Sequence, residues 1–170
     1  MILNELVANL MIYIATVSGG FGGDLGYDSK MDIVHEYGLP EVQFVSREQL
    51  FLMRFQRKPS SDESLNVQAI QFGHTIYLHE DWDAQNLKDQ SILLHELVHI
   101  MQDNNNFYYN CDGDKERLAY YIQEKWLLEE QEFSQEGFYK ALSLHPLVMV
   151  SAMTCIERQI QLAKPWQAGP

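Results

Sequence analysis

One short run, His95-Glu96-Leu97-Val98-His99, constrains this chain more than any other feature. Residues four apart lie one above the other on the same face of an α-helix, so both imidazoles project from one rigid element. The neighbouring residues are apolar almost all round, which is typical of a buried helix: Leu93, Leu94, Leu97, Val98, Ile100 and Met101. Buried histidines need polar partners. A metal ion is the partner that uses both at once.

Glu96 follows the first histidine directly, so it is rotated around the helix and flanks the metal instead of ligating it. A carboxylate in that position can accept a proton from a water that the metal holds. We therefore expect Glu96 to be a catalytic general base and His95 and His99 to be zinc ligands.

A catalytic zinc ion needs a third protein ligand and an open position for water. A third nearby histidine is excluded, because Gln102 and Asn105 stand where the extended motif has glycine and histidine. The next predicted helix begins at Lys115, and we choose its Glu116 as the third ligand. Four residues share the face of that helix, with a small alanine that permits close approach: Glu116, Ala119, Tyr120 and Gln123. The alternatives are Asp112, Asp114 and Glu124, or a Glu116 that only favours the positive end of the helix dipole.

The two histidines with Glu96, followed by Glu116-x-x-Ala119 on a later helix, resemble the gluzincin group of zinc metallopeptidases, and more narrowly its smallest stand-alone bacterial members. The resemblance covers roughly positions 66 to 125. It implies a zincin-like domain, zinc held by His95, His99 and Glu116, and Glu96 as the general base. It also implies that segment 71–78 forms the lower edge of a cleft and pairs with an extended peptide. The linker before Glu116 is shorter than in the large gluzincins.

The residue that would stabilise the oxyanion in such a reaction is not part of the motif. Tyr120, Tyr121 and His145 are the candidates. The other histidines, His35, His74 and His79, are isolated, and we expect ordinary surface or capped side chains there. Of these, His79 lies on the candidate edge strand.

The leading hypothesis is a zinc peptidase that acts on a peptide or protein substrate. An alternative is a catalytically inactive zinc-stabilised domain that binds a peptide or protein without cleaving it. A third interpretation is a metal-free helical domain in which the motif arises by chance.

The acidic composition argues against two classes of binding partner. The net charge of −12 argues against nucleic acid and against anionic membrane surfaces. No apolar run is long enough to span a membrane. A disulfide between Cys111 and Cys155 would suit a periplasmic or secreted protein, whereas two free thiols would suit a cytoplasmic one.

The chain is predicted to form a single α+β domain over residues 1–170, with a small antiparallel-containing sheet packed on a helical core. An amphipathic helix is expected over residues 6–17. A flexible glycine-rich linker or loop is expected after it, either anchored by Phe21 and Tyr27 or acting as a mobile flap. Strands are expected at 40–45, 67–72 and 75–79, the last two joined as a hairpin at Gly73-His74. Further helices are expected at 47–56, 115–131 and 143–163. Trp82, Trp126 and Trp166 are expected to be core or boundary residues.

Overall fold

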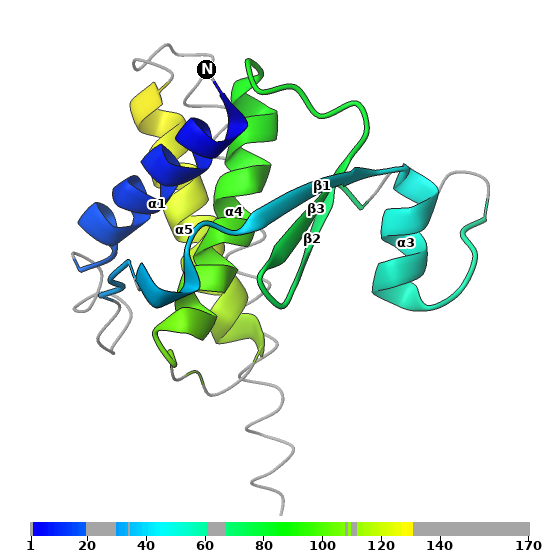
Figure 1. The fold of residues 1–170 in the computed structure, drawn as a ribbon. Coiled ribbons are helices and arrows are strands. Elements are labelled where there is room, and N and C mark those ends of the chain that lie inside the picture. The colour runs from blue at the N-terminus through cyan, green and yellow to red at the C-terminus, as the bar shows by residue number, and fades with distance from the viewer. Residues whose placement is uncertain are drawn as a thin grey trace, which may run out of the picture.

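The computed structural model describes residues 2–19, 30–33, 35–60, 67–107, 109 and 112–130, and they form an α+β fold. Three long helices pack together beside a small sheet, and a shorter helix lies at the far end of the sheet (Figure 1). The elements are α1 (Leu3–Ser18), η1 (His35–Tyr37), β1 (Glu41–Val45), α3 (Arg47–Phe55), β2 (Ala69–Phe72), β3 (Thr75–His79), α4 (Leu87–Asn104) and α5 (Asp112–Glu130).

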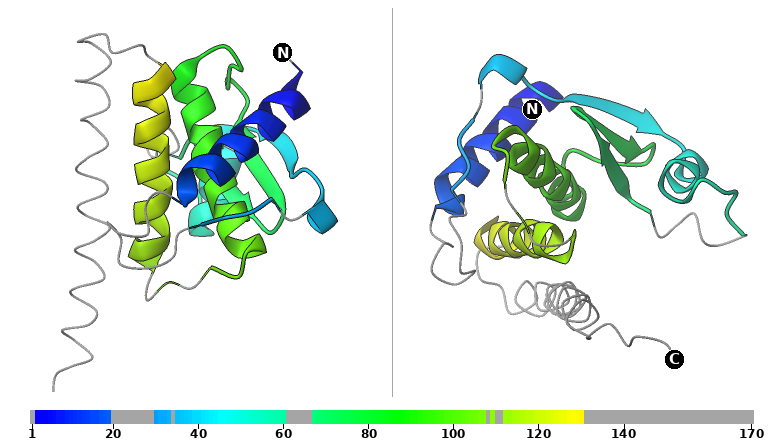
Figure 2. Two further views of the ribbon diagram at one scale, coloured as in Figure 1. Left: turned by 90° about the vertical axis from the view of Figure 1, so that its left-hand side faces the viewer. Right: turned by 90° about the horizontal axis from the view of Figure 1, so that it is seen from below.

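Helix α4, which carries the histidine motif, is the centre of the molecule. Figure 2 shows it between the sheet and the two other long helices, α1 and α5. Its start is defined by the Asn86 side chain, which accepts hydrogen bonds from the backbone N–H groups of Lys88 and Asp89. Apolar residues on every side of the helix are fully buried, among them Leu93, Leu94, Leu97 and Val98. This confirms the prediction of a buried helix.

The sheet has the order β1-β3-β2, with β1 parallel and β2 antiparallel to β3. The tight turn at Gly73-His74 joins β2 to β3 as predicted, and Gly73 takes a positive φ of 60° there. The prediction for His79 was wrong in two respects. First, this residue lies on the central strand, because β1 pairs with β3 along the edge that β2 leaves open. Second, its side chain is buried, with only 3% exposed.

The two faces of the sheet are covered by different helices. Ile76 and Leu78 join the main core formed with α1, α4 and α5. Ile70 points to the opposite face, where it packs with Leu50 and Phe51 of α3. The sheet is therefore held between α4 and α3, although α3 covers only part of its face (Figure 1).

The other helices in the described part lie where they are predicted, but α1 and α5 each begin three residues earlier than expected. The apolar stripe of α1 is buried as its spacing predicts, through Leu6, Val7, Leu10, Met11 and Ile14. Helix α5 begins at Asp112, three residues earlier than predicted. Residues 112–114 form its first turn, since acidic residues are favoured at the positive end of a helix. Asp114 also forms an ion pair with Arg117, one turn later in the same helix.

Trp82 and Trp126 are buried in the main core as expected. None of the described helices combines the length and apolar character needed to cross a membrane. The predictions for Cys111, Cys155, His145, Trp166, the glycine-rich loop and helix 143–163 lie outside the described residues.

Candidate metal centre

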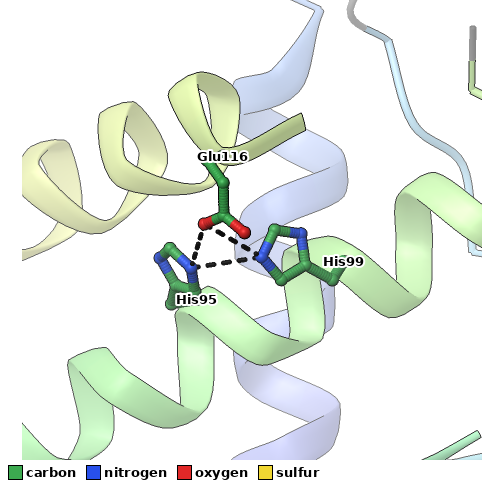
Figure 3. Close-up of side chains that lie close together, drawn as sticks. All are labelled: His95, His99 and Glu116. Atoms are coloured by element: carbon green, nitrogen blue, oxygen red, sulfur yellow. Dashed lines mark hydrogen bonds and ion pairs between the residues drawn. The ribbon is translucent and has the colours of Figure 1, made fainter. Parts of the chain in front are cut away.

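The structure brings the three predicted ligands together at the contact between α4 and α5. His95 and His99 extend from one face of α4, and Glu116 reaches them from the first turns of α5 (Figure 3). The two Nε2 atoms are 3.1 Å apart, and Glu116 Oε2 is 3.1 Å from that of His95 and 3.5 Å from that of His99. Two imidazole nitrogens and one carboxylate oxygen therefore surround a single point.

The alternative third ligands do not take part in this cluster. Asp114 is buried but faces Arg117, at 3.6 Å. Glu124 is half-buried and is not among the residues whose ligand atoms converge. The side chain of Asp112 lies outside the described residues. Glu116 is thus the carboxylate that the fold places opposite the histidine pair.

The buried Gln102 determines how His99 presents its ring. Its amide Nε2 donates a hydrogen bond to the backbone carbonyl of Lys115 at 3.1 Å, so its Oε1 is the atom that faces His99 Nδ1, at 2.9 Å. An amide oxygen only accepts, and therefore Nδ1 of His99 carries a hydrogen. In the neutral ring, the lone pair is then on Nε2, which points to Glu116.

Gln123 on α5 has the same effect on His95. The hydroxyl of Ser91 donates to the carbonyl of Lys88 at 2.7 Å and accepts from Gln123 Nε2 at 3.0 Å. The Oε1 atom of Gln123 is left facing His95 Nδ1 at 3.2 Å, so this nitrogen also carries the hydrogen. Each histidine is oriented by a buried amide, which is the kind of outer partner that metal-binding histidines have.

These hydrogen positions leave only acceptor atoms at the centre of the cluster, which is electrostatically unfavourable. With both rings neutral, two lone pairs and a carboxylate face one another, and none of the three groups can donate a hydrogen bond to the others. A proton or a cation must lie between them. Burial acts to lower the pKa of His99, but its hydrogen bond with Glu116 and the charges of Glu96 and Glu116 raise it overall. Burial acts to raise the pKa of Glu116, but hydrogen bonds from the two histidines, which require hydrogen on their Nε2 atoms, hold this pKa well below its usual range.

Two further side chains border the cluster. Glu96, which directly follows His95, is half-buried, and its charge acts to raise the pKa of His99 and of Tyr120. The ring of Tyr120 lies against that of His95, with centroids 4.5 Å apart. Burial, followed by the charges of Glu116 and Glu96, raises the pKa of Tyr120, and Arg54 partly offsets this.

Asp103, at the end of α4, connects the cluster to the sheet. One carboxylate oxygen accepts from Lys115 Nζ at 2.8 Å and the other accepts from Gln71 Nε2 at 3.2 Å. Lys115 directly precedes Glu116, and Gln71 belongs to β2. The edge strand and the first turn of α5 are thus held at the same carboxylate.

Sequence reasoning did not identify Gln102, Gln123 and Ser91 as partners of the histidines. The sequence did offer a way to predict the contact of Gln123, because Gln123 lies on the same helix face as Glu116. Gln102 and Ser91 lie on the motif helix itself, one turn from the histidines. Their roles follow from the hydrogen bonds that form when α4 and α5 pack.

Comparison with known proteins gives a family but no activity. Residues 25–146 match the family described as Domain of unknown function (DUF6647), which is more than half of the chain. The chain belongs to this family. No curated protein matches. No solved structure matches either.

Proposed function

We propose that this protein is a zinc-dependent peptidase whose metal is held by His95, His99 and Glu116. The observation that carries the proposal is the convergence of two imidazole Nε2 atoms and a carboxylate oxygen, with both rings oriented by buried glutamine amides. Two nitrogens and one oxygen are a common donor set for catalytic zinc, and three protein ligands leave a position for water or substrate. The residues present therefore fit the metal.

The reaction we propose is hydrolysis of a peptide bond. A zinc ion in this site would polarise the carbonyl and make water more acidic. Glu96 takes a proton from the attacking water while the water oxygen forms a bond to the carbonyl carbon of the substrate. When the carbon–nitrogen bond breaks, Glu96 returns that proton to the leaving amine. The half-buried carboxylate beside the ligand histidines supports this role.

Strand β2 is the proposed binding edge for the substrate. It pairs with β3 alone among the described strands. Its register places Ala69 and Gln71 opposite Leu78 and Ile76, at positions between the hydrogen-bonded pairs of the hairpin, so their backbone groups point away from β3. An extended peptide can add to such an edge through main-chain hydrogen bonds. Gln71 and Lys115 both bond to Asp103, which supports a link between this edge and the start of α5.

The decisive variant is Glu96→Gln, which removes the base and keeps the shape of the side chain. We expect wild type to bind one zinc per chain and to cleave a mixed-peptide library, with cleavage abolished by a chelator. Glu96→Gln should keep its zinc and lose turnover by about 10³-fold or more, since general-base catalysis and the proton return are both lost. Turnover by the variant at the wild-type rate would contradict the mechanism.

An inactive zinc-stabilised binding domain is the second candidate. It is favoured by one observation, that the ligands come from both α4 and α5, so a metal would also clamp these helices together. This candidate has no use for Glu96. It predicts zinc-dependent stability and peptide binding with no cleavage by wild type.

A further inference from the structure

The ring of Tyr120 lies against the candidate ligand His95, and two neighbours of Tyr120 on α5 contact the same imidazole. Tyr120 is one turn after Glu116 on α5, and Gln123 follows it by a further three residues. Glu116 and Gln123 bond to Nε2 and Nδ1 of His95, and the Tyr120 ring lies against the same imidazole at 4.5 Å and 51°. The aromatic ring is therefore held on one side of the metal centre.

The hydroxyl of Tyr120 is available to a ligand. The side chain is half-buried, and its oxygen makes no hydrogen bond within the described part of the chain. The hydroxyl lies within electrostatic range of two carboxylates, Glu116 and Glu96. The tyrosine ring therefore borders the metal centre on the side of His95, within the electrostatic influence of the third ligand and the general base.

The neighbouring tyrosine has a different environment. Tyr121 is half-buried and packs against the main hydrophobic core. The successive positions 120 and 121 point about 100° apart around the helix, so only one of them can face the cluster. The third candidate, His145, lies outside the described residues.

We propose that the Tyr120 hydroxyl donates a hydrogen bond to the substrate carbonyl oxygen as this oxygen gains negative charge. The inference rests on the proposed function and assigns the oxyanion donor of that reaction to this residue. A donor aimed at developing charge in a water-poor site lowers the barrier more than it strengthens ground-state binding. Removing it should therefore lower kcat and leave KM nearly unchanged.

The experiment compares zinc-loaded full-length wild type with Tyr120→Phe and, as the matched control, Tyr121→Phe. Three quantities are measured: zinc per chain, kcat and KM on the best-cleaved peptide of a mixed library, and the Kd of a phosphinic dipeptide. The phosphinic group is tetrahedral and anionic, so it imitates the charge that develops during hydrolysis. Its binding is measured by calorimetry and does not depend on turnover.

We expect Tyr120→Phe to keep its zinc, to lose about 10²-fold in kcat with KM within about twofold, and to bind the phosphinic dipeptide about 10-fold or more weakly. Tyr121→Phe should match wild type in all three. Wild-type kcat and phosphinate Kd in Tyr120→Phe would overturn the assignment and leave the proposed function intact. Loss of zinc from Tyr120→Phe would overturn it as well, because the role would then be structural. A zinc-loaded wild type that neither cleaves peptides nor binds the phosphinate would overturn both proposals.

Discussion

The hydrogen bond from His95 to Gln123 offers a sharp test of how the site is built. Gln123 is only 6% exposed, and its amide bonds to His95 on one side and to Ser91 on the other. Gln123→Met keeps the length of the side chain and removes both bonds. Ser91 keeps its bond to the Lys88 carbonyl, but Nδ1–H of His95 loses its acceptor in a buried place.

A buried donor left without a partner costs about 1–3 kcal/mol. If His95 recovers this cost by moving its hydrogen to Nε2 or by turning its ring, the ligand lone pair is lost from the metal position. The expected fall in zinc affinity is then about 10- to 100-fold, the usual effect of removing such an outer partner, and each factor of ten corresponds to about 1.4 kcal/mol. The two estimates agree in size, since both describe the loss of the same hydrogen bond.

The assay is competition for zinc with a chromophoric chelator at pH 7.5, for wild type, Gln123→Met and Gln123→Glu. The glutamate variant is the matched control because its carboxylate still accepts from Nδ1–H, so it should bind zinc at least as tightly as wild type. Unfolding in urea with a chelator present reports on the fold without metal. If Gln123→Met binds zinc as tightly as wild type, the reasoning about the orientation of His95 is refuted.

Two further predictions concern the third ligand and a buried histidine remote from the cluster. Glu116→Gln should lower zinc affinity by about 10²-fold or more, whereas Asp114→Asn, which changes another carboxylate of the same helix turn, should keep it. Elemental analysis after dialysis distinguishes the two variants, and full zinc in Glu116→Gln would show that the third ligand is another residue. The buried His79 accepts from Arg47, and burial followed by the Arg47 charge lowers the pKa of His79 below 6.5. The neutral ring therefore contributes stability that is complete above pH 6.5 and is lost as the pH falls through the lowered pKa. Thermal melting between pH 8 and pH 5 should show a smaller loss for His79→Gln than for wild type, and equal losses would contradict this account.

Local periodicity determined much of this protein from the sequence alone. The four-residue spacing of His95 and His99 already places both rings on one face of a helix, because every α-helix has the same pitch. The apolar stripe of α1 and the hairpin at Gly73-His74 are likewise local patterns, and both are present. The pairing of the motif with a glutamate on the next helix was predicted from the sequence, and the packing of α4 on α5 brings Glu116 to the histidines.

Tertiary structure decided the features that depend on residues far apart in the chain. β1 pairs with β3 across more than thirty residues, and this contact alone moves His79 from the expected edge to the centre of the sheet. The choice among Asp114, Glu116 and Glu124 depended on where α5 begins and how it rotates against α4. The orientation of the two histidines depends on Gln102 and Gln123, whose amides are directed by a carbonyl and a hydroxyl that only packing brings near. Helix spacing fixes which side chains share a face, but the free energy of burying polar groups selects the partners that they meet across the interface.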